Sequence, residues 1–523
     1  MRSTEASVAL RRKGGCDEGH STSPDAIRSA HRAGHGGGAD AALSGQALHH
    51  INRTAGERAQ RWFPTNKQAE PSIAQNPTNP LNIIVGSGDE IAEPPCTDTF
   101  PSSCPVVPGI SISGFYASFD GGKTFPCQGL IDLSAFGKWA EADPWVTFDS
   151  QGNAYYGQLA FDNVPGPPAS VADIFVAKST DGGCTWSSAA KASGSSKAKY
   201  DDKDSIAADA HPSSPFRDNV YAAWTKFGKT FSNIQIVFNR STDGGATWGK
   251  PQQISQATFS EGGRTGAVVQ VGPDGTVYVV WADVVKRDPD IRVAISHDGG
   301  KTFPNKDVKV ASLASDNPFD DPLPGASFFG GTGLPSFAVA ADGDLYVAWG
   351  RRTNDHTVAM VVKASDGGLN WGVPVVAGDV LGRSEIFQAV AVDPTGRVEL
   401  VFNALDDVPV GTPPGAGVVF YDAYWTQSTD GGATWSTPLK ISSQSSDPDV
   451  SAFNQLAPQF IGDYISATAD GSHVYGVWTD GRNGSTCAAI DAYALGTGPK
   501  PNVIQQCPVA FGNTDIYLGS VST

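Results

Sequence analysis

The octapeptide Ser241-Thr242-Asp243-Gly244-Gly245-Ala246-Thr247-Trp248 occurs in six closely similar copies along the chain. The other copies cover residues 118–125, 179–186, 296–303, 364–371 and 428–435. Their aspartates, from Asp120 to Asp430, follow one another at intervals of 61, 62, 55, 68 and 64 residues. Repetition at this spacing indicates one structural unit that recurs along the chain.

The residue types of the octapeptide predict a hairpin turn. The aspartate can accept hydrogen bonds from the backbone of its own turn, and the glycine pair can adopt the positive φ that such turns need. The Ser or Thr adds a second local bond, and the final aromatic residue anchors the turn on the sheet. We interpret the octapeptide as a structural turn. A calcium loop would need further carboxylates at fixed spacing, which the copies lack.

A second recurring unit, strand–turn–strand, precedes each octapeptide, and its clearest copy covers residues 269–281. Related segments begin near residues 70, 143, 204, 335, 387 and 463. Three or four short strands in about 65 residues form one blade of a β-propeller. The sequence therefore predicts an all-β fold, a seven-bladed propeller over residues 67–523, with six blades as the alternative. We expect the last blade to use residues 465–469, 474–478 and 515–521, with a strand near residues 59–63 closing the ring.

Composition limits the function classes. The chain has 523 residues, a net charge of −17, 60 glycines and 36 prolines. An acidic chain is a poor partner for nucleic acid, and no apolar run is long enough to span a membrane. Residues 1–66 lack apolar periodicity and read as a disordered leader without a visible secretory signal. We expect a monomer.

Cysteine usage indicates an oxidising compartment. Cys96 and Cys104 flank a Pro-rich loop and are predicted to form a short bridge, as are Cys487 and Cys507. Cys127 and Cys184 remain in the repeats, and Cys16 is the odd residue in the leader. The alternative is free buried thiols. We expect an extracellular protein.

The octapeptide resembles the Asp box of the bacterial neuraminidase repeat, and the chain from residue 67 to 523 is similar to the sialidase superfamily of β-propellers. The resemblance implies an arginine clamp for an acidic sugar, a tyrosine nucleophile and an acid/base carboxylate. Carried over by local pattern, the tyrosine is Tyr464 in Asp463-Tyr464-Ile465-Ser466, and the acid/base candidates in the first loop are Asp89 and Glu90. Of the nearby carboxyl groups we expect Asp89 or Glu70 to act as the acid/base. The candidate arginines are Arg264, Arg351 and Arg383. Glu70 stands where the family has its first arginine.

Independently of the resemblance, the residues at the start of each repeat indicate a functional site in the same region. They are unusually ionic, and they would line the mouth of a central channel: Glu70, Asp143, Asp202, Asp204, Arg264, Arg383 with Glu385, and Asp463 with Tyr464. Converging carboxylates raise the pKa of one of them and make an acid available. Trp145 is the tryptophan we expect to stack on a sugar ring. The alternative is that these side chains only cap the ends of the strands and bind no ligand.

We therefore expect a sialidase-like glycoside hydrolase that acts on acidic glycans, with a non-catalytic propeller that binds a glycan or a protein as the alternative. No catalytic zinc or Ser-His motif is present. We expect no cofactor and no metal. The alternative is that the acidic segment 316–321 binds Ca²⁺ through its oxygen ligands.

Overall fold

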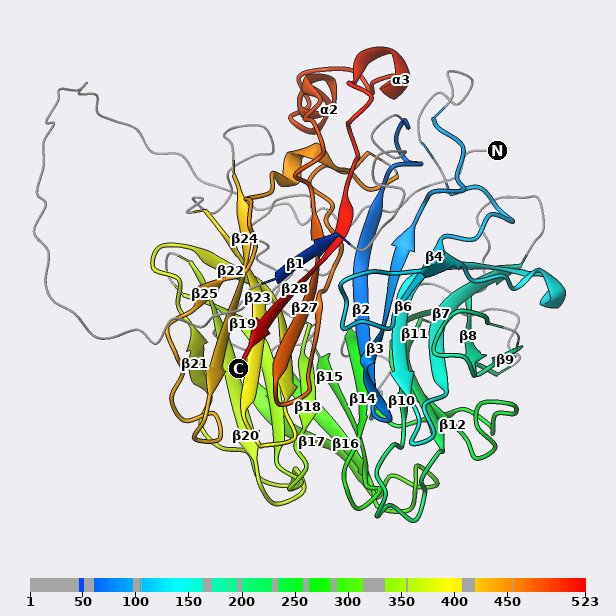
Figure 1. The fold of residues 1–523 in the computed structure, drawn as a ribbon, viewed down its shortest axis with the longest axis vertical. Coiled ribbons are helices and arrows are strands. Elements are labelled where there is room, and N and C mark those ends of the chain that lie inside the picture. The colour runs from blue at the N-terminus through cyan, green and yellow to red at the C-terminus, as the bar shows by residue number, and fades with distance from the viewer. Residues whose placement is uncertain are drawn as a thin grey trace, which may run out of the picture. The chain divides into compact units, whose positions relative to one another are not determined.

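The computed structural model describes residues 47–50 and 61–523, apart from 97–103, 105, 163–171, 187, 195–199, 228–233, 257–262, 284–288, 314–333, 354–355, 407–418 and 455. Residues 43–523 form one compact unit. Within the described part the regular secondary structure is almost entirely β-strand, and the two short α-helices are α2 (Ala488–Ala494) and α3 (Val503–Gln506). Figure 1 shows both helices beyond one end of the strands.

The strands form seven successive sets of four, each an antiparallel meander. The first three sets are β2 (Gln68–Asn76), β3 (Asn79–Asp89), β4 (Ser113–Ser118) and β5 (Cys127–Leu130); β6 (Lys138–Phe148), β7 (Ala154–Asp162), β8 (Ala172–Ser179) and β9 (Ser188–Lys191); and β10 (Tyr200–Ala208), β11 (Val220–Phe227), β12 (Gln235–Ser241) and β13 (Gln252–Gln253). A single parallel pair, Tyr200 with Ala172, joins the second and third sets into one eight-stranded sheet.

The next three sets are β14 (Arg264–Val271), β15 (Val277–Asp283), β16 (Asp290–Ser296) and β17 (Asn305–Ser312); β18 (Ser336–Val339), β19 (Leu345–Arg352), β20 (Thr357–Ala364) and β21 (Val375–Gly378); and β22 (Ser384–Val392), β23 (Val398–Leu405), β24 (Tyr421–Ser428) and β25 (Leu439–Lys440). The last set is β26 (Ser466–Ala469), β27 (His473–Asp480), β28 (Asp515–Ser522) and β1 (Ala47–His50). Each set thus begins with the strand predicted to open a repeat.

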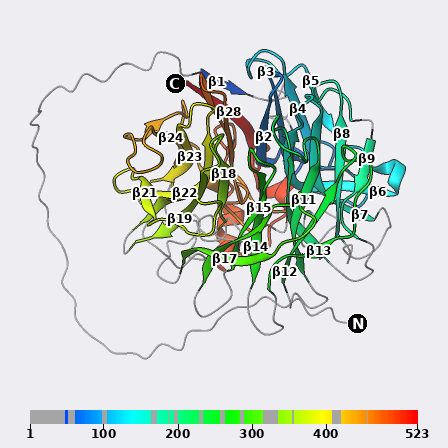
Figure 2. The ribbon, with the colours of Figure 1, turned by 90° about the horizontal axis from the view of Figure 1, so that it is seen from below.

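The first strands of the sets follow one another around a closed ring. β2 contacts β6, and the contacts continue through β10, β14, β18 and β22 to β26, which returns to β2. Figure 2 shows the sets succeeding one another in colour order around this ring. Buried residues of adjacent sets share common apolar clusters, such as the one that joins β14–β17 to β18–β20. The core is therefore divided among the interfaces between sets.

Hydroxyl groups connect consecutive first strands. Ser205 Oγ accepts a hydrogen bond from the backbone N–H of Val269 at 3.0 Å, which joins β10 to β14. The same kind of bond occurs at four other junctions: Ser72 with Val146, Thr147 with Ala208, Ser336 with Val390, and Ser466 with Ile73. These bonds satisfy backbone donors that would otherwise be buried without a partner.

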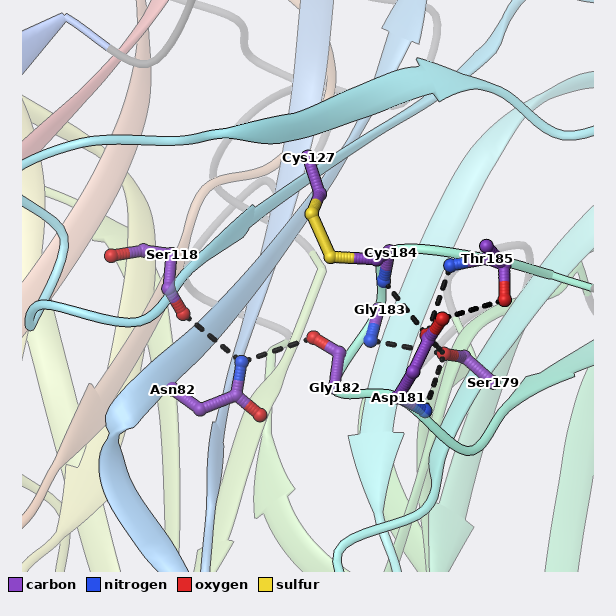
Figure 3. Close-up of a disulfide and its surroundings, with 9 residues drawn as sticks. All are labelled: Asn82, Ser118, Cys127, Ser179, Asp181, Gly182, Gly183, Cys184 and Thr185. Carbon is purple, nitrogen blue, oxygen red and sulfur yellow. Dashed lines mark hydrogen bonds between the residues drawn. A yellow bond between two sulfur atoms is a disulfide. The ribbon is translucent and has the colours of Figure 1, made fainter.

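The octapeptide turns make the predicted hydrogen bonds. In the second copy, Asp181 Oδ1 accepts from the Thr185 N–H at 2.9 Å, and Asp181 Oδ2 accepts from the Thr185 hydroxyl at 2.7 Å. Ser179 Oγ accepts from the Gly183 N–H at 2.9 Å, and Gly183 has a φ of 95°. Burial alone would raise the pKa of Asp181, but the Thr185 bonds hold it below its usual value. Figure 3 shows this turn.

The second octapeptide also connects the first two sets. Cys184 in the turn forms a disulfide with Cys127 of β5 (Figure 3). Asn82 of β3 donates to the carbonyl of Ser118 in its own set and to the carbonyl of Gly182 in the next, both at 3.0 Å. The other two predicted bridges are also present, Cys96–Cys104 and Cys487–Cys507. The six cysteines in the described residues are therefore all paired: two bridges were predicted, and the Cys127–Cys184 bridge joins the two cysteines whose state the sequence left open.

The closing strand differs from the prediction. β1 (Ala47–His50) pairs with β28 at the outer edge of the last set. Residues 61–63 form no strand, and residues 59 and 60 lie outside the described residues. Pairing at this edge is made by backbone groups, which give little sequence signal.

Removing one inter-strand hydroxyl tests the role of these bonds. Ser205→Ala leaves the Val269 N–H buried and unpaired, so we expect the free energy of unfolding to fall by about 1–3 kcal/mol. Ser188 is exposed on the outer strand β9 and provides the control. Urea unfolding should show little change for Ser188→Ala. Equal stability of the two variants would contradict a stabilising role for the Ser205 bond.

Candidate functional site

Five first strands contain a register shift near their start, and at each shift one residue has a positive φ. These residues are Glu70 (φ 59°) in β2, Asp143 (φ 48°) in β6, Lys203 (φ 52°) in β10, Gly266 (φ 68°) in β14 and Phe387 (φ 56°) in β22. A bulge redirects a side chain. A non-glycine residue in this backbone region costs about 1–3 kcal/mol and is common at functional sites.

Lys203 lies at the centre of an ionic cluster that draws on several sets. Its Nζ is 3.5 Å from Asp143 Oδ1 of β6 and 3.9 Å from Asp463 Oδ2, just before β26. It also lies over the ring of Tyr464, 3.7 Å from the centroid. Burial alone would lower the pKa of Lys203, but Asp143, Glu70 and Asp463 hold it above its usual value. The buried ammonium therefore stays charged.

Glu70 completes the cluster from β2. Its Oε1 accepts a hydrogen bond from the Asp463 N–H at 3.3 Å. Burial, with a smaller contribution from Asp143, raises the pKa of Glu70 to about 8, although Lys203 opposes the shift. Glu70 is thus protonated at neutral pH and can donate a proton.

Two aspartates of β10 and the tyrosine share this environment. Burial, followed by the charge of Asp143, raises the pKa of both Asp202 and Asp204 well above the usual value. The pKa of Tyr464 is also raised well above its usual value, first by burial and then by Asp143 and Glu70. The phenol therefore keeps its proton in the free protein.

Two cavities meet at this point. The smaller, of about 50 Å³, is lined by residues of the cluster and by an apolar wall. The wall and cluster residues include Trp145, Lys203, Asp204, Leu334, Phe387, Gln388, Asp463 and Tyr464. The larger, of about 290 Å³, is lined by the first strands of the sets. Trp145 lines both cavities, and its ring centroid is 6.4 Å from that of Tyr464.

The structure brings together seven of the residues predicted to converge at the mouth or to bind there: Glu70, Asp143, Trp145, Asp202, Asp204, Asp463 and Tyr464. The predicted arginines lie elsewhere. Arg264 pairs with Asp283 at 3.3 Å and donates to the carbonyl of Gln256 at 2.8 Å. The arginines do not line either cavity.

Arg383, the second predicted arginine, pairs with Asp406 at 2.5 Å and with Asp422 at 3.1 Å. Arg351 is half-buried in β19. Because Arg264 and Arg383 are held by carboxylates of their own sets, the anion clamp implied by the resemblance is not assembled at these cavities.

The remaining predicted carboxylates also serve local contacts. Glu385 accepts from the Ala359 and Val380 N–H groups at 2.5 and 2.9 Å. Burial raises the pKa of Glu385 to about 7, although these two hydrogen bonds lower it. Asp89 accepts from Gln68 Nε2 at 3.2 Å and also binds the Tyr116 hydroxyl. Neither carboxylate lines either of these two cavities.

Lys203 is the site residue that sequence reasoning missed. The signal was present in Asp201-Asp202-Lys203-Asp204, where one cation is surrounded by acids at the start of a repeat. The predicted residues at this point were the carboxylates. A buried carboxylate cluster needs a counter-charge, and that requirement identifies the lysine.

Metal and membrane features can be assessed for the described residues. In this part of the chain no three His, Cys, Asp or Glu side chains are placed to hold a metal ion together. The acidic segment 316–321 lies outside the described residues. No helix within the described ranges has the length and hydropathy to cross a membrane.

No protein family description matches the chain, and no curated protein is significantly similar to it. Among solved structures it is similar to the Hadza microbial sialidase Hz136 (16% identity, TM-score 0.41, covering 70% of this chain and 71% of that one). It is also similar to a PL25 ulvan lyase (11% identity, TM-score 0.47, covering 80% of this chain and 92% of that one). A third similar structure is the NanB sialidase of Streptococcus pneumoniae (11% identity, TM-score 0.40, covering 84% of this chain and 83% of that one). Similarity at this level assigns no activity to the chain.

The pKa of Glu70 predicts a pH-dependent stability. Because the folded-state pKa of about 8 lies above the unfolded value of 4.5, the contribution is fully present below pH 4.5 and is lost as the pH rises through 8. Glu70→Gln removes this titration. We expect the stability of the wild type, relative to that of the variant, to fall by up to about 1.4 kcal/mol per pH unit in this window. Urea unfolding of both proteins across the window checks it. Parallel pH profiles would contradict the raised pKa.

Proposed function

We propose that residues 67–523, with β1, form a seven-bladed β-propeller. The support is the closed ring of seven first strands, each followed by an antiparallel meander. Radial repetition of four-stranded sheets around a channel is the propeller architecture. The start of each first strand then lies at one mouth of the channel, where the bulged residues gather.

We propose that a glycan binds at this mouth and that the protein cleaves a glycosidic bond there. The observation that carries the proposal is the convergence of Glu70, Asp143, Lys203 and Tyr464 beside Trp145. Trp145 is half-buried and lines both cavities, so its ring offers a sugar a stacking surface. A carboxyl group protonated at neutral pH, next to ion-paired carboxylates, provides the acid that glycoside hydrolysis needs.

In this proposal Glu70 donates its proton to the leaving-group oxygen. Tyr464 attacks the anomeric carbon, and its own proton passes to Asp143, because a nucleophile of raised pKa needs an adjacent base. The transition state carries positive charge on the sugar. The surrounding carboxylates stabilise that charge.

A second candidate, a propeller that binds a glycan without cleaving it, is favoured by one observation. The proposed acid Glu70 and base Asp143 are not among the residues that line the smaller cavity, so a ligand there meets other residues, such as Trp145, Phe387 and Gln388. Binding in the absence of turnover separates this candidate from the first. For either function we propose an extracellular location, because three disulfides form within the fold.

Removal of the Tyr464 hydroxyl tests the catalytic proposal. In a panel of chromogenic glycosides, Tyr464→Phe should reduce kcat by about a hundredfold or more, because the nucleophile is lost while the ring remains. Tyr493 on α2 gives a control of the same chemistry outside the pocket. Tyr493→Phe should retain wild-type kcat. Unchanged turnover in Tyr464→Phe would exclude the nucleophile role.

A further inference from the structure

The pocket beside Tyr464 contains more carboxyl groups than cations. Glu70, Asp143, Asp202, Asp204 and Asp463 act electrostatically on one another and on Lys203. The ammonium of Lys203 is occupied from two sides, by the carboxylates of Asp143 and Asp463 and by the Tyr464 ring. An incoming anion would have to displace these partners before it could bind the ammonium.

Three buried polar side chains that line this pocket have atoms without hydrogen-bond partners: Lys203, Asp204 and Gln388. Asp204 is 4% exposed and Gln388 is 5% exposed, and the atoms concerned are both carboxylate oxygens of Asp204 and the Oε1 of Gln388. Hydroxyl O–H and ammonium N–H groups complement these acceptors. The third side chain, Lys203, makes no hydrogen bond through its Nζ but already faces the carboxylates of Asp143 and Asp463.

Tyr464 shows how the pocket treats an anion. Its anionic form is disfavoured first by burial and then by the neighbouring carboxyl groups, of which Asp143 contributes most. A sugar carboxylate placed beside the same ring would meet the same burial and the same Asp143 carboxylate. The groups that commonly compensate for such repulsion, arginine side chains, are absent from the described lining of the pocket.

We infer that this pocket selects against acidic sugars and accepts sugars whose ring is uncharged or bears an amine. The inference rests on the proposed glycan-binding function and specifies its substrate class. Specificity here comes from repulsion, since a like charge placed in a site of low polarity costs several kcal/mol. It departs from the acidic glycan that the sialidase resemblance implied, because the arginines needed for that ligand are paired elsewhere.

The test compares matched sugars that differ only in charge. Methyl glycosides of glucose, glucosamine and glucuronic acid, and the corresponding galactose series, are titrated by calorimetry at a pH at which the amine is protonated. We expect the acidic member of each series to bind at least about tenfold more weakly than the neutral member. We expect the amine-bearing member to bind at least as tightly as the neutral one, and the difference to shrink at high salt.

Substitutions identify the side chains that discriminate against the acidic sugar. Asp143→Asn keeps the shape of the side chain and removes a carboxylate that pairs with Lys203, so the acidic sugar should regain several-fold in relative affinity, about 3-fold or more. Asp342, exposed in the turn between β18 and β19, is the matched control, and Asp342→Asn should leave the ratio unchanged. If Asp143→Asn does not fold, Asp463→Asn removes the other carboxylate that pairs with Lys203.

The outcomes separate the inference from the proposed function. Tightest binding or fastest turnover of the acidic sugar, or equal affinity for the three forms, overturns the inference and leaves glycan binding intact. Binding of neutral and amine-bearing sugars without hydrolysis supports the inference and excludes the hydrolase. No binding of any form overturns both.

Discussion

The hydrogen bonds between consecutive first strands are the interaction on which the arrangement of the site depends. In β2, β10, β18 and β26 the serine at one equivalent position accepts from the N–H of the next first strand. β6 has Trp145 at that position, and Thr147, two residues later, makes the bond to β10 instead. These bonds fix the position of each first strand along its own axis relative to the next first strand. The bulges at the register shifts therefore lie at the same end of the ring of first strands.

The exceptions to this pattern coincide with a change in the pocket wall. β14 and β22 carry Val268 and Ala389 at the equivalent position. Their bulges hold Gly266 and Phe387, whereas those of β2, β6 and β10 hold charged residues. The pocket is therefore asymmetric: the sets from β2 to β13 and the last set supply its charges, and the sets from β14 to β25 supply its apolar wall.

The fold was largely predictable because it is repetitive. Six octapeptides and the strand pairs before them indicated the sets and their first strands, since turn chemistry and alternating apolar residues are local properties of the sequence. β1 was not predicted correctly, because an edge strand is selected by backbone pairing with β28. Two of the three cysteine pairs were predicted from spacing, whereas the Cys127–Cys184 pair, 57 residues apart in sequence, became evident only in the structure.

The site was predictable only in part. Glu70, Asp143 and Tyr464 converge because repeat-opening residues share one end of the ring, and the repeat itself shows that. The partners of Arg264 and Arg383 could not be predicted, because Asp283, Asp406 and Asp422 lie on other strands of the same sets. A family pattern assigns an arginine to a strand but does not show which carboxylate within that set it meets.

The most direct test of the central claim is a crystal structure of the protein soaked with a neutral or amine-bearing oligosaccharide. The account predicts density for a sugar ring stacked on Trp145, with its anomeric carbon facing Tyr464 and its glycosidic oxygen towards Glu70. A sugar bound only elsewhere on the surface, with the space beside Trp145 and Tyr464 unchanged, would contradict it.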